Sequence, residues 1–227
     1  MQNIEKNLSH LQSLIETDAN KYGRQANSIL LLAVSKKMPA DAIRAAQRLG
    51  QRDFGENYLQ EALEKIDELG KLDLIWHFIG AIQSNKTRNI AENFAWVHCV
   101  DRLKIAQRLS EQRPASLPAL NVCIQVNLDD EAGKAGIPVD QIQELAASIS
   151  PLKNIRLRGL MAIPEKRSDI SAQREAFARL RTALQELQQQ GLNCDTLSMG
   201  MSGDLEAAIA EGSTLVRIGT AIFGERT

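Results

Sequence analysis

Lys36 is the first residue of this sequence whose type and surroundings could support covalent chemistry. It follows an unbroken apolar run, Ile29 to Val34, and precedes Pro39, which stops a strand and starts a helix. A lysine amine must be neutral to attack an aldehyde, and burial or a neighbouring cation such as Lys37 lowers its pKa. Taken alone, the stretch favours an ordinary solubilising lysine at the start of a loop. The periodicity of the strand does not tell whether Lys36 or Lys37 points inward.

Glycine and hydroxyl residues recur at two places near the C-terminus. Gly200 is followed by Ser202, and Gly219 is followed by Thr220, with Arg217 close by. Glycine lets the backbone approach an anion closely, and backbone N–H groups with hydroxyls are typical phosphate ligands. The two stretches together therefore favour a phosphate site.

Ser202 also has a simpler interpretation. It suits the N-cap of a helix expected over 202–210, whose first turn carries Asp204 and Glu206. Those carboxylates would stabilise the helix dipole and would repel a phosphate that they faced. Considered alone, Ser202 favours capping, and only the two stretches together reverse that preference.

Short apolar runs alternate with amphipathic segments, which is typical of βα units and a parallel sheet. After a first helix that ends near Tyr22, we expect strands at 29–35, 53–55, 74–79, 96–100, 119–126, 155–162, 196–199 and 214–218. The helices are expected at 40–49, 58–69, 84–93, 102–112, 139–149, 170–190 and 202–210. Asp101 suits an N-cap, and Gly191 suits the end of the longest helix.

Eight strands with intervening helices predict an α/β fold, a single-domain (β/α)8 TIM barrel over residues 1–227 with an extra N-terminal helix. The alternative is an open doubly wound sheet. We favour the barrel because an open sheet rarely needs eight strands and no dinucleotide-binding glycine pattern follows the first strand. In a barrel, Lys36 lies opposite the two glycine stretches at one face. A phosphorylated aldehyde held between them, with Arg217 at the edge, describes pyridoxal 5′-phosphate (PLP).

Composition excludes several other classes of protein. Lys and Arg number 27 against 28 Asp and Glu, so the charge pattern of a nucleic-acid-binding protein is absent. Cys99, Cys123 and Cys194 form no CxxC pair, which argues against a disulfide framework or a zinc site and favours buried thiols. The N-terminus reads as an amphipathic helix, not a signal peptide, so we expect a cytoplasmic protein with no membrane partner.

Six long motifs carry a resemblance that covers almost the whole chain. They are LLAVSK (31–36), FGENYLQE (54–61), WHFIGAIQSNK (76–86), RGLMAIP (158–164), MGMSGDLEAAI (199–209) and VRIGTAIFG (216–224). With these motifs in this order, the chain resembles the pyridoxal phosphate homeostasis protein family, single-domain relatives of the alanine racemase N-terminal barrel. The resemblance implies PLP as cofactor, a monomer, and PLP-requiring apo-enzymes as partners.

The resemblance also implies roles for individual residues. Lys36 would hold PLP as a Schiff base, Asn57 would lie beside the cofactor, and Arg217 would face the pyridine nitrogen. The residues that would border the phosphate are Met199, Ser202, Gly219 and Thr220. One departure concerns cofactor loading or release: where many relatives have a second lysine two places after the first, this chain has Met38. Lys134 matches another lysine near the family's pocket.

Three functions remain open at the level of sequence. The first is a non-catalytic carrier or regulator in vitamin B6 homeostasis, because an arginine at the ring nitrogen makes a weak electron sink and the chain stops at Thr227, without the racemases' second domain. The second is a weak PLP-dependent amino-acid racemase with an unidentified base. The third is a cofactor-free Schiff-base aldolase acting through Lys36. His77 is either a satisfied core histidine or a residue that supports the site, and Trp76 is expected to pack.

Overall fold

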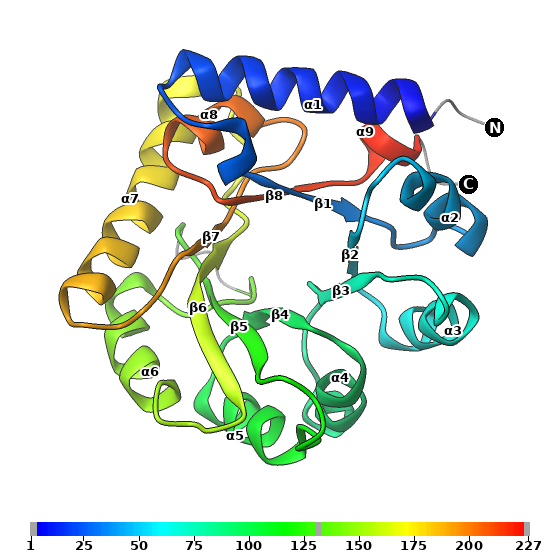
Figure 1. Ribbon diagram of the computed structural model, residues 1–227. Helices are drawn as coiled ribbons and strands as arrows, with labels where there is room; N and C mark the ends of the chain where they lie inside the picture. Colours follow the sequence, from blue (N-terminus) through cyan, green and yellow to red (C-terminus); the bar gives the residue numbers. More distant parts are fainter. Residues whose placement is uncertain (1–3, 130–132, 225–227) are drawn as a thin grey trace.

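The computed structural model describes residues 4–129 and 133–224. Eight parallel strands close into one barrel in chain order, with the helices outside them (Figure 1). The strands are β1 Leu30–Val34, β2 Asp53–Glu56, β3 Ile75–Phe78, β4 Trp96–Val100, β5 Leu120–Val126, β6 Ile155–Ala162, β7 Thr196–Ser198 and β8 Leu215–Ile218. The predicted barrel is confirmed, including its brief second strand, and the open sheet is excluded because β1 pairs with both β2 and β8.

Helices follow the strands and cover the barrel's outer face (Figure 1). They are α1 Ile4–Lys21, α2 Ala40–Arg48, α3 Leu59–Leu69, α4 Thr87–Asn93, α5 Leu103–Gln112, α6 Ile142–Ile149, α7 Ile170–Gln189, α8 Leu205–Ala210 and α9 Thr220–Phe223. Single 3₁₀ turns precede α4 and α6, so these helices begin three residues later than the sequence predicts. Of the residues between β5 and α6, 130–132 lie outside the described part of the chain.

The extra N-terminal helix α1 lies outside β8 and β1 (Figure 1). Its apolar residues at helical spacing, Leu8, Leu11 and Ile15, are buried. They pack the helix against α8 and α9, which are too short to cover that side of the barrel alone. The predicted leading helix is therefore part of the barrel's outer layer.

The longest helix, α7, buries apolar residues at helical spacing along most of its length. Phe177, Leu180 and Leu184 are buried against the sheet, whereas Ile170 in the first turn is exposed. Gly191, with φ +86°, follows the C-cap and ends the helix as expected.

The N-cap predicted at Asp101 is wrong. Helix α5 begins at Leu103 with Arg102 at its N-cap, and no side chain caps it. The Asp101 carboxylate instead accepts a hydrogen bond from the Arg102 guanidinium at 2.7 Å. Because the Asp101 carboxylate pairs with Arg102, it does not cap the helix.

The three cysteines, Cys99, Cys123 and Cys194, are buried and form no disulfide with one another. Among residues 4–129 and 133–224, no helix is long and apolar enough to cross a membrane. Over the same residues, no group of three or more His, Cys, Asp or Glu could hold a metal ion.

Candidate functional site

A cavity of about 320 Å³ opens where the C-terminal ends of the strands meet. This is the face at which (β/α)8 barrels carry their sites. The cavity is lined by Val34, Lys36, Asn57, Ile79, Ile163, Met201, Ser202, Gly203, Arg217, Gly219 and Thr220. These residues come from the ends of strands 1, 2, 3, 6, 7 and 8, so closure of the barrel is what brings them together.

The structure gathers six of the seven residues singled out in the sequence into this cavity. Met199 is the seventh, and its side chain is fully buried and does not line it. Gly200, at φ +99°, turns the chain after Met199, and Met201 takes the place at the cavity wall. Apolar contacts from Ile79 and Ile163 were missed because strand-end isoleucines carry no distinctive sequence signal.

Ser202 does not cap a helix. Helix α8 begins at Leu205, three residues later than predicted, with Asp204 at its N-cap. The Asp204 carboxylate accepts the Met201 N–H at 2.6 Å and so closes the β7–α8 loop from within. Ser202 is left exposed at the cavity wall, and the capping explanation for this residue is removed.

The β7–α8 loop presents unused donors to the cavity. Within the described part of the chain, the N–H groups of Ser202 and Gly203 donate to no protein acceptor. The Ser202 and Thr220 hydroxyls likewise have no protein partner among those residues. Glu206, whose charge could oppose an anion, instead contacts Lys21 at the end of α1 and Tyr22, the residue after it. The loop is therefore suited to an anion such as a phosphate.

Arg217 lies at the base of the cavity and is almost completely buried. Its Nη1 donates to the Ser198 carbonyl at 2.5 Å and to the Ser198 hydroxyl at 2.8 Å, and its Nη2 donates to the Ala162 carbonyl at 2.9 Å. Burial lowers the pKa of Arg217 to about 10, so the guanidinium stays protonated at neutral pH. Two of its five N–H groups remain for a ligand acceptor.

A chain of buried hydrogen bonds runs from Arg217 through the barrel interior. The Ser198 hydroxyl lies 2.8 Å from Nδ1 of His98, and Nε2 of His98 lies 2.9 Å from Nδ1 of His77. Nε2 of His77 reaches the Asp53 carboxylate at 2.9 Å, at the first residue of β2. The interior of the barrel therefore connects the cavity with its opposite end.

The donor and acceptor in each of these hydrogen bonds follow from the groups at the two ends of the series, Arg217 and Asp53. Arg217 is only a donor, so the Ser198 hydroxyl accepts from it and donates to Nδ1 of His98. His98 then donates from Nε2 to His77, and His77 donates from Nε2 to the Asp53 carboxylate. Burial lowers the pKa of both histidines, most strongly that of His98, which keeps them neutral. His77 is thus a satisfied core histidine and also supports Arg217 indirectly.

Close packing around Asn57 fixes its backbone at the cavity. A Cβ atom on Gly80 would lie 2.1 Å from the Asn57 carbonyl oxygen, so only glycine fits beside it. The Asn57 side-chain oxygen is buried and has no hydrogen-bond donor among the described residues. A group bound in the cavity or a rotation of the amide would satisfy that oxygen.

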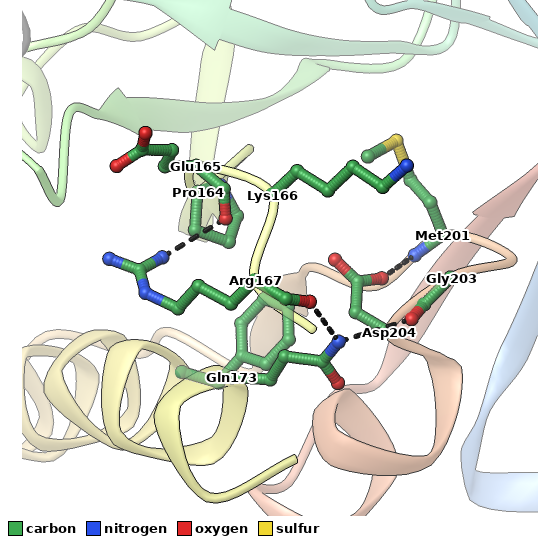
Figure 2. Close-up of a pocket in the computed structure, with 9 residues that line it drawn as sticks. Pro164, Glu165, Lys166, Arg167, Gln173, Met201, Gly203 and Asp204 are labelled. Atoms are coloured by element: carbon green, nitrogen blue, oxygen red, sulfur yellow. Dashed lines mark hydrogen bonds between the residues drawn. The ribbon is translucent and has the colours of Figure 1, made fainter. Parts of the chain in front are cut away.

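A second cavity of about 320 Å³ adjoins the first and shares Met201 and Gly203 with it. Figure 2 shows Lys166 extended across it toward Met201, with the Asp204 carboxylate bonded to the Met201 N–H. Gln173 donates to the Arg167 and Gly203 carbonyls and so joins the β6–α7 loop to the β7–α8 loop. Lys134 is exposed and lines neither cavity.

Comparisons with known proteins agree on one family. The model of the family described as alanine racemase, N-terminal domain, matches residues 2–227. The pyridoxal phosphate homeostasis protein of Pseudomonas aeruginosa is 60% identical over 226 residues, covering 100% of this chain and 97% of that protein.

Solved structures show the same relationship. PipY of Synechococcus elongatus, solved with PLP bound, is 40% identical and superposes with a TM-score of 0.86 over 98% of this chain and 100% of PipY. Alanine racemase from Corynebacterium glutamicum superposes with a TM-score of 0.72 at 15% identity, over 97% of this chain and 61% of the racemase, which establishes a shared fold.

Proposed function

Because this chain belongs to the pyridoxal phosphate homeostasis proteins, within the alanine racemase N-terminal domain family, we propose that it binds PLP in the cavity at the C-terminal face of the barrel. The observation that carries the proposal is the gathering of Lys36, Arg217 and the Ser202 loop around one cavity of about 320 Å³. A lysine amine, a buried guanidinium and unused backbone donors correspond to the aldehyde, the ring nitrogen and the phosphate of that cofactor.

Each part of the cavity has a chemical task in this proposal. Ser202, Gly203, Gly219 and Thr220 bind the phosphate through hydroxyl and N–H donors. Arg217 donates a hydrogen bond to the ring nitrogen, which then accepts no proton of its own and makes the ring a weak electron sink. PLP would supply an aldehyde, and Lys36 is the residue whose Nζ would hold it covalently.

The role that follows is storage and delivery, with little turnover. A weak electron sink disfavours carbanion chemistry, in keeping with the homeostasis role by which the relatives are named. We propose that the protein acts in the cytoplasm as a single-domain monomer and supplies PLP to PLP-requiring apo-enzymes. Turnover of L-alanine or L-serine by the loaded protein would favour the racemase alternative instead.

The test is the near-ultraviolet and visible spectrum of the purified protein with PLP, before and after borohydride reduction. We expect a chromophore that reduction fixes as a pyridoxyl group, located on Lys36 by mass spectrometry. Lys36→Ala should abolish this modification while leaving the unfolding midpoint close to that of the wild type, and Lys86→Ala, at an exposed lysine outside the cavity, is the control. A colourless protein that stays colourless with added PLP would reject the proposal.

A further inference from the structure

The turn that carries Lys36 has an unusual backbone. The Met38 N–H donates to the Ser35 carbonyl at 3.0 Å, which closes a tight turn with Lys36 and Lys37 at its centre. Lys37 has φ +61° and is the only described residue other than glycine with a positive φ. The left-handed conformation is unfavourable for a residue with a side chain. Such strain persists where surrounding contacts impose it, and it is frequent at functional sites.

Side chains from β2 and α3 impose this conformation. Glu61 accepts the Lys37 N–H at 2.5 Å, and Lys65 Nζ donates to the Ser35 carbonyl at 2.8 Å. The Ser35 hydroxyl donates to Glu56 at 2.6 Å. The residues before and after Lys36 are therefore both bonded to side chains outside the turn, which determines the direction in which the Lys36 side chain leaves the backbone.

Glu56, Glu61 and Lys65 form one ionic cluster, in which Glu56 and Lys65 are buried and Glu61 is partly exposed. Lys65 Nζ also donates to Glu56 at 2.8 Å and to Glu61 at 2.5 Å, so all three of its protons are used. Lys65 is 6% exposed and Glu56 is 0% exposed. Burial raises the pKa of Glu56, an effect that Lys65 opposes. Burying such a cluster contributes little net stability compared with an apolar replacement, so stability alone does not account for it.

We propose that Glu61 and Lys65 are positioning residues that hold the Lys36 turn in the conformation needed for the covalent link. The inference rests on the proposed function, since it concerns the lysine that would bind PLP. Neither side chain lines the cavity, so both act through the backbone on either side of Lys36. Their loss should affect the formation of the link and leave the phosphate and ring contacts intact.

The experiment separates covalent from non-covalent binding. Pyridoxamine 5′-phosphate has the same ring and phosphate but no aldehyde, so its affinity measures the cavity without Lys36 chemistry. For PLP, the growth of the borohydride-trappable product on Lys36 is followed in time. We expect Glu61→Ala to slow this growth about tenfold, because small displacements of a reacting group have large effects on rate. Its affinity for pyridoxamine 5′-phosphate should stay within about twofold of the wild type.

Three further variants of α3 sharpen the test. Glu61→Gln keeps an oxygen that can accept the Lys37 N–H and should restore most of the rate. Glu64→Ala, at an exposed position of the same helix, should behave as the wild type. Lys65→Met should slow the link as Glu61→Ala does, and Glu61→Ala keeps the test decisive if Lys65→Met fails to fold, because the Glu61 side chain is partly exposed.

Each unfavourable result has a distinct meaning. If Glu61→Ala forms the link at the wild-type rate, or loses pyridoxamine 5′-phosphate affinity to the same extent, the positioning role is rejected and the PLP proposal stands. If wild-type protein forms no link on Lys36 at all, the proposed function fails, and this inference fails with it.

Discussion

Lys36 and Lys37 are adjacent in sequence but differ in what they can contribute. Lys36 lines the cavity, whereas the Lys37 side chain is exposed and does not. Met38, at the position where the resemblance implies a second lysine, packs against the hydrophobic core. The cavity therefore has one lysine among the residues that line it, Lys36.

The strain at Lys37 makes a prediction at the level of a single residue. Lys37→Gly removes a left-handed strain of about 1–2 kcal/mol, offset by the greater chain entropy of glycine in the unfolded state, about 0.5–1 kcal/mol. We expect a net gain of about 0.5–1 kcal/mol in the free energy of unfolding, measured by urea denaturation. Lys71 is an exposed lysine whose φ is not positive, so Lys71→Gly should not raise the free energy of unfolding. A destabilised Lys37→Gly protein would show that its side chain contributes more than its backbone costs.

At the scale of elements, the loop between β7 and α8 determines the shape of one side of the cavity. Asp204 bonds the loop internally, and Gln173 of α7 ties it to the preceding βα loop. Gly200 lies where the strand ends, and its positive φ turns the chain toward the cavity. A short helix can begin only after this turn, which explains why α8 starts at Leu205.

The fit of Gly200 gives the prediction at this scale. Its added Cβ would lie 2.6 Å from the Ala208 Cβ at a φ of +99°. We expect Gly200→Ala to reduce the free energy of unfolding by about 2–4 kcal/mol, from overpacking and left-handed strain together, and to weaken PLP binding. Denaturation and spectroscopic titration measure the two effects.

Gly203→Ala is the matched control in the same loop. A Cβ at Gly203 would meet no atom within 4 Å, and its φ is not positive. The change in the free energy of unfolding should stay within about 0.5 kcal/mol. Equal destabilisation by both substitutions would mean that the loop tolerates no side chain at all, against the specific clash described for Gly200.

At the scale of the whole molecule, a series of hydrogen-bonded polar side chains crosses the barrel interior, where many barrels have only apolar layers. It begins at Asp53, whose side chain is 16% exposed, and ends at Arg217 in the cavity. Both histidines are held neutral, and each accepts a hydrogen bond at Nδ1. Protonation of either would turn that acceptor into a donor and break a hydrogen bond of the series. Global stability is therefore linked to the pH range in which free histidine titrates.

The sign of this linkage follows from the lowered pKa values. Below the ordinary histidine pKa of 6.5, the unfolded chain takes up protons on His77 and His98 that the folded protein excludes. Their stabilising contribution is thus complete above about pH 6.5 and falls as the pH decreases, by up to about 1.4 kcal/mol per pH unit for each histidine.

Comparing variants isolates the effect of one histidine. Between pH 6.5 and 5, His98→Gln should reduce the pH slope of the free energy of unfolding by up to about 1.4 kcal/mol per pH unit, whatever its absolute stability. His10→Gln, at an exposed histidine of α1, should leave the slope unchanged. Retention of the wild-type slope in His98→Gln would show that His98 accepts a proton in the folded protein.

The sequence could predict most of the residues around the cavity, because glycine, hydroxyl and lysine residues at strand ends carry a local signal. It could not predict that Met199 lies outside the cavity wall or that α8 starts at Leu205, since both depend on the turn at Gly200. It also missed His98, because a histidine inside a buried strand looks the same whether or not it has partners. Those partners come from strands that are distant in the chain.

By itself, the sequence determined the barrel and its leading helix, because hydrophobic periodicity is a local property. Only the tertiary structure decided which polar groups meet. The Glu61 and Lys65 anchors of the Lys36 turn, and the path from Asp53 to Arg217, join residues of different strands and helices. The distances between such groups are determined when the barrel closes, and no spacing along the chain encodes them.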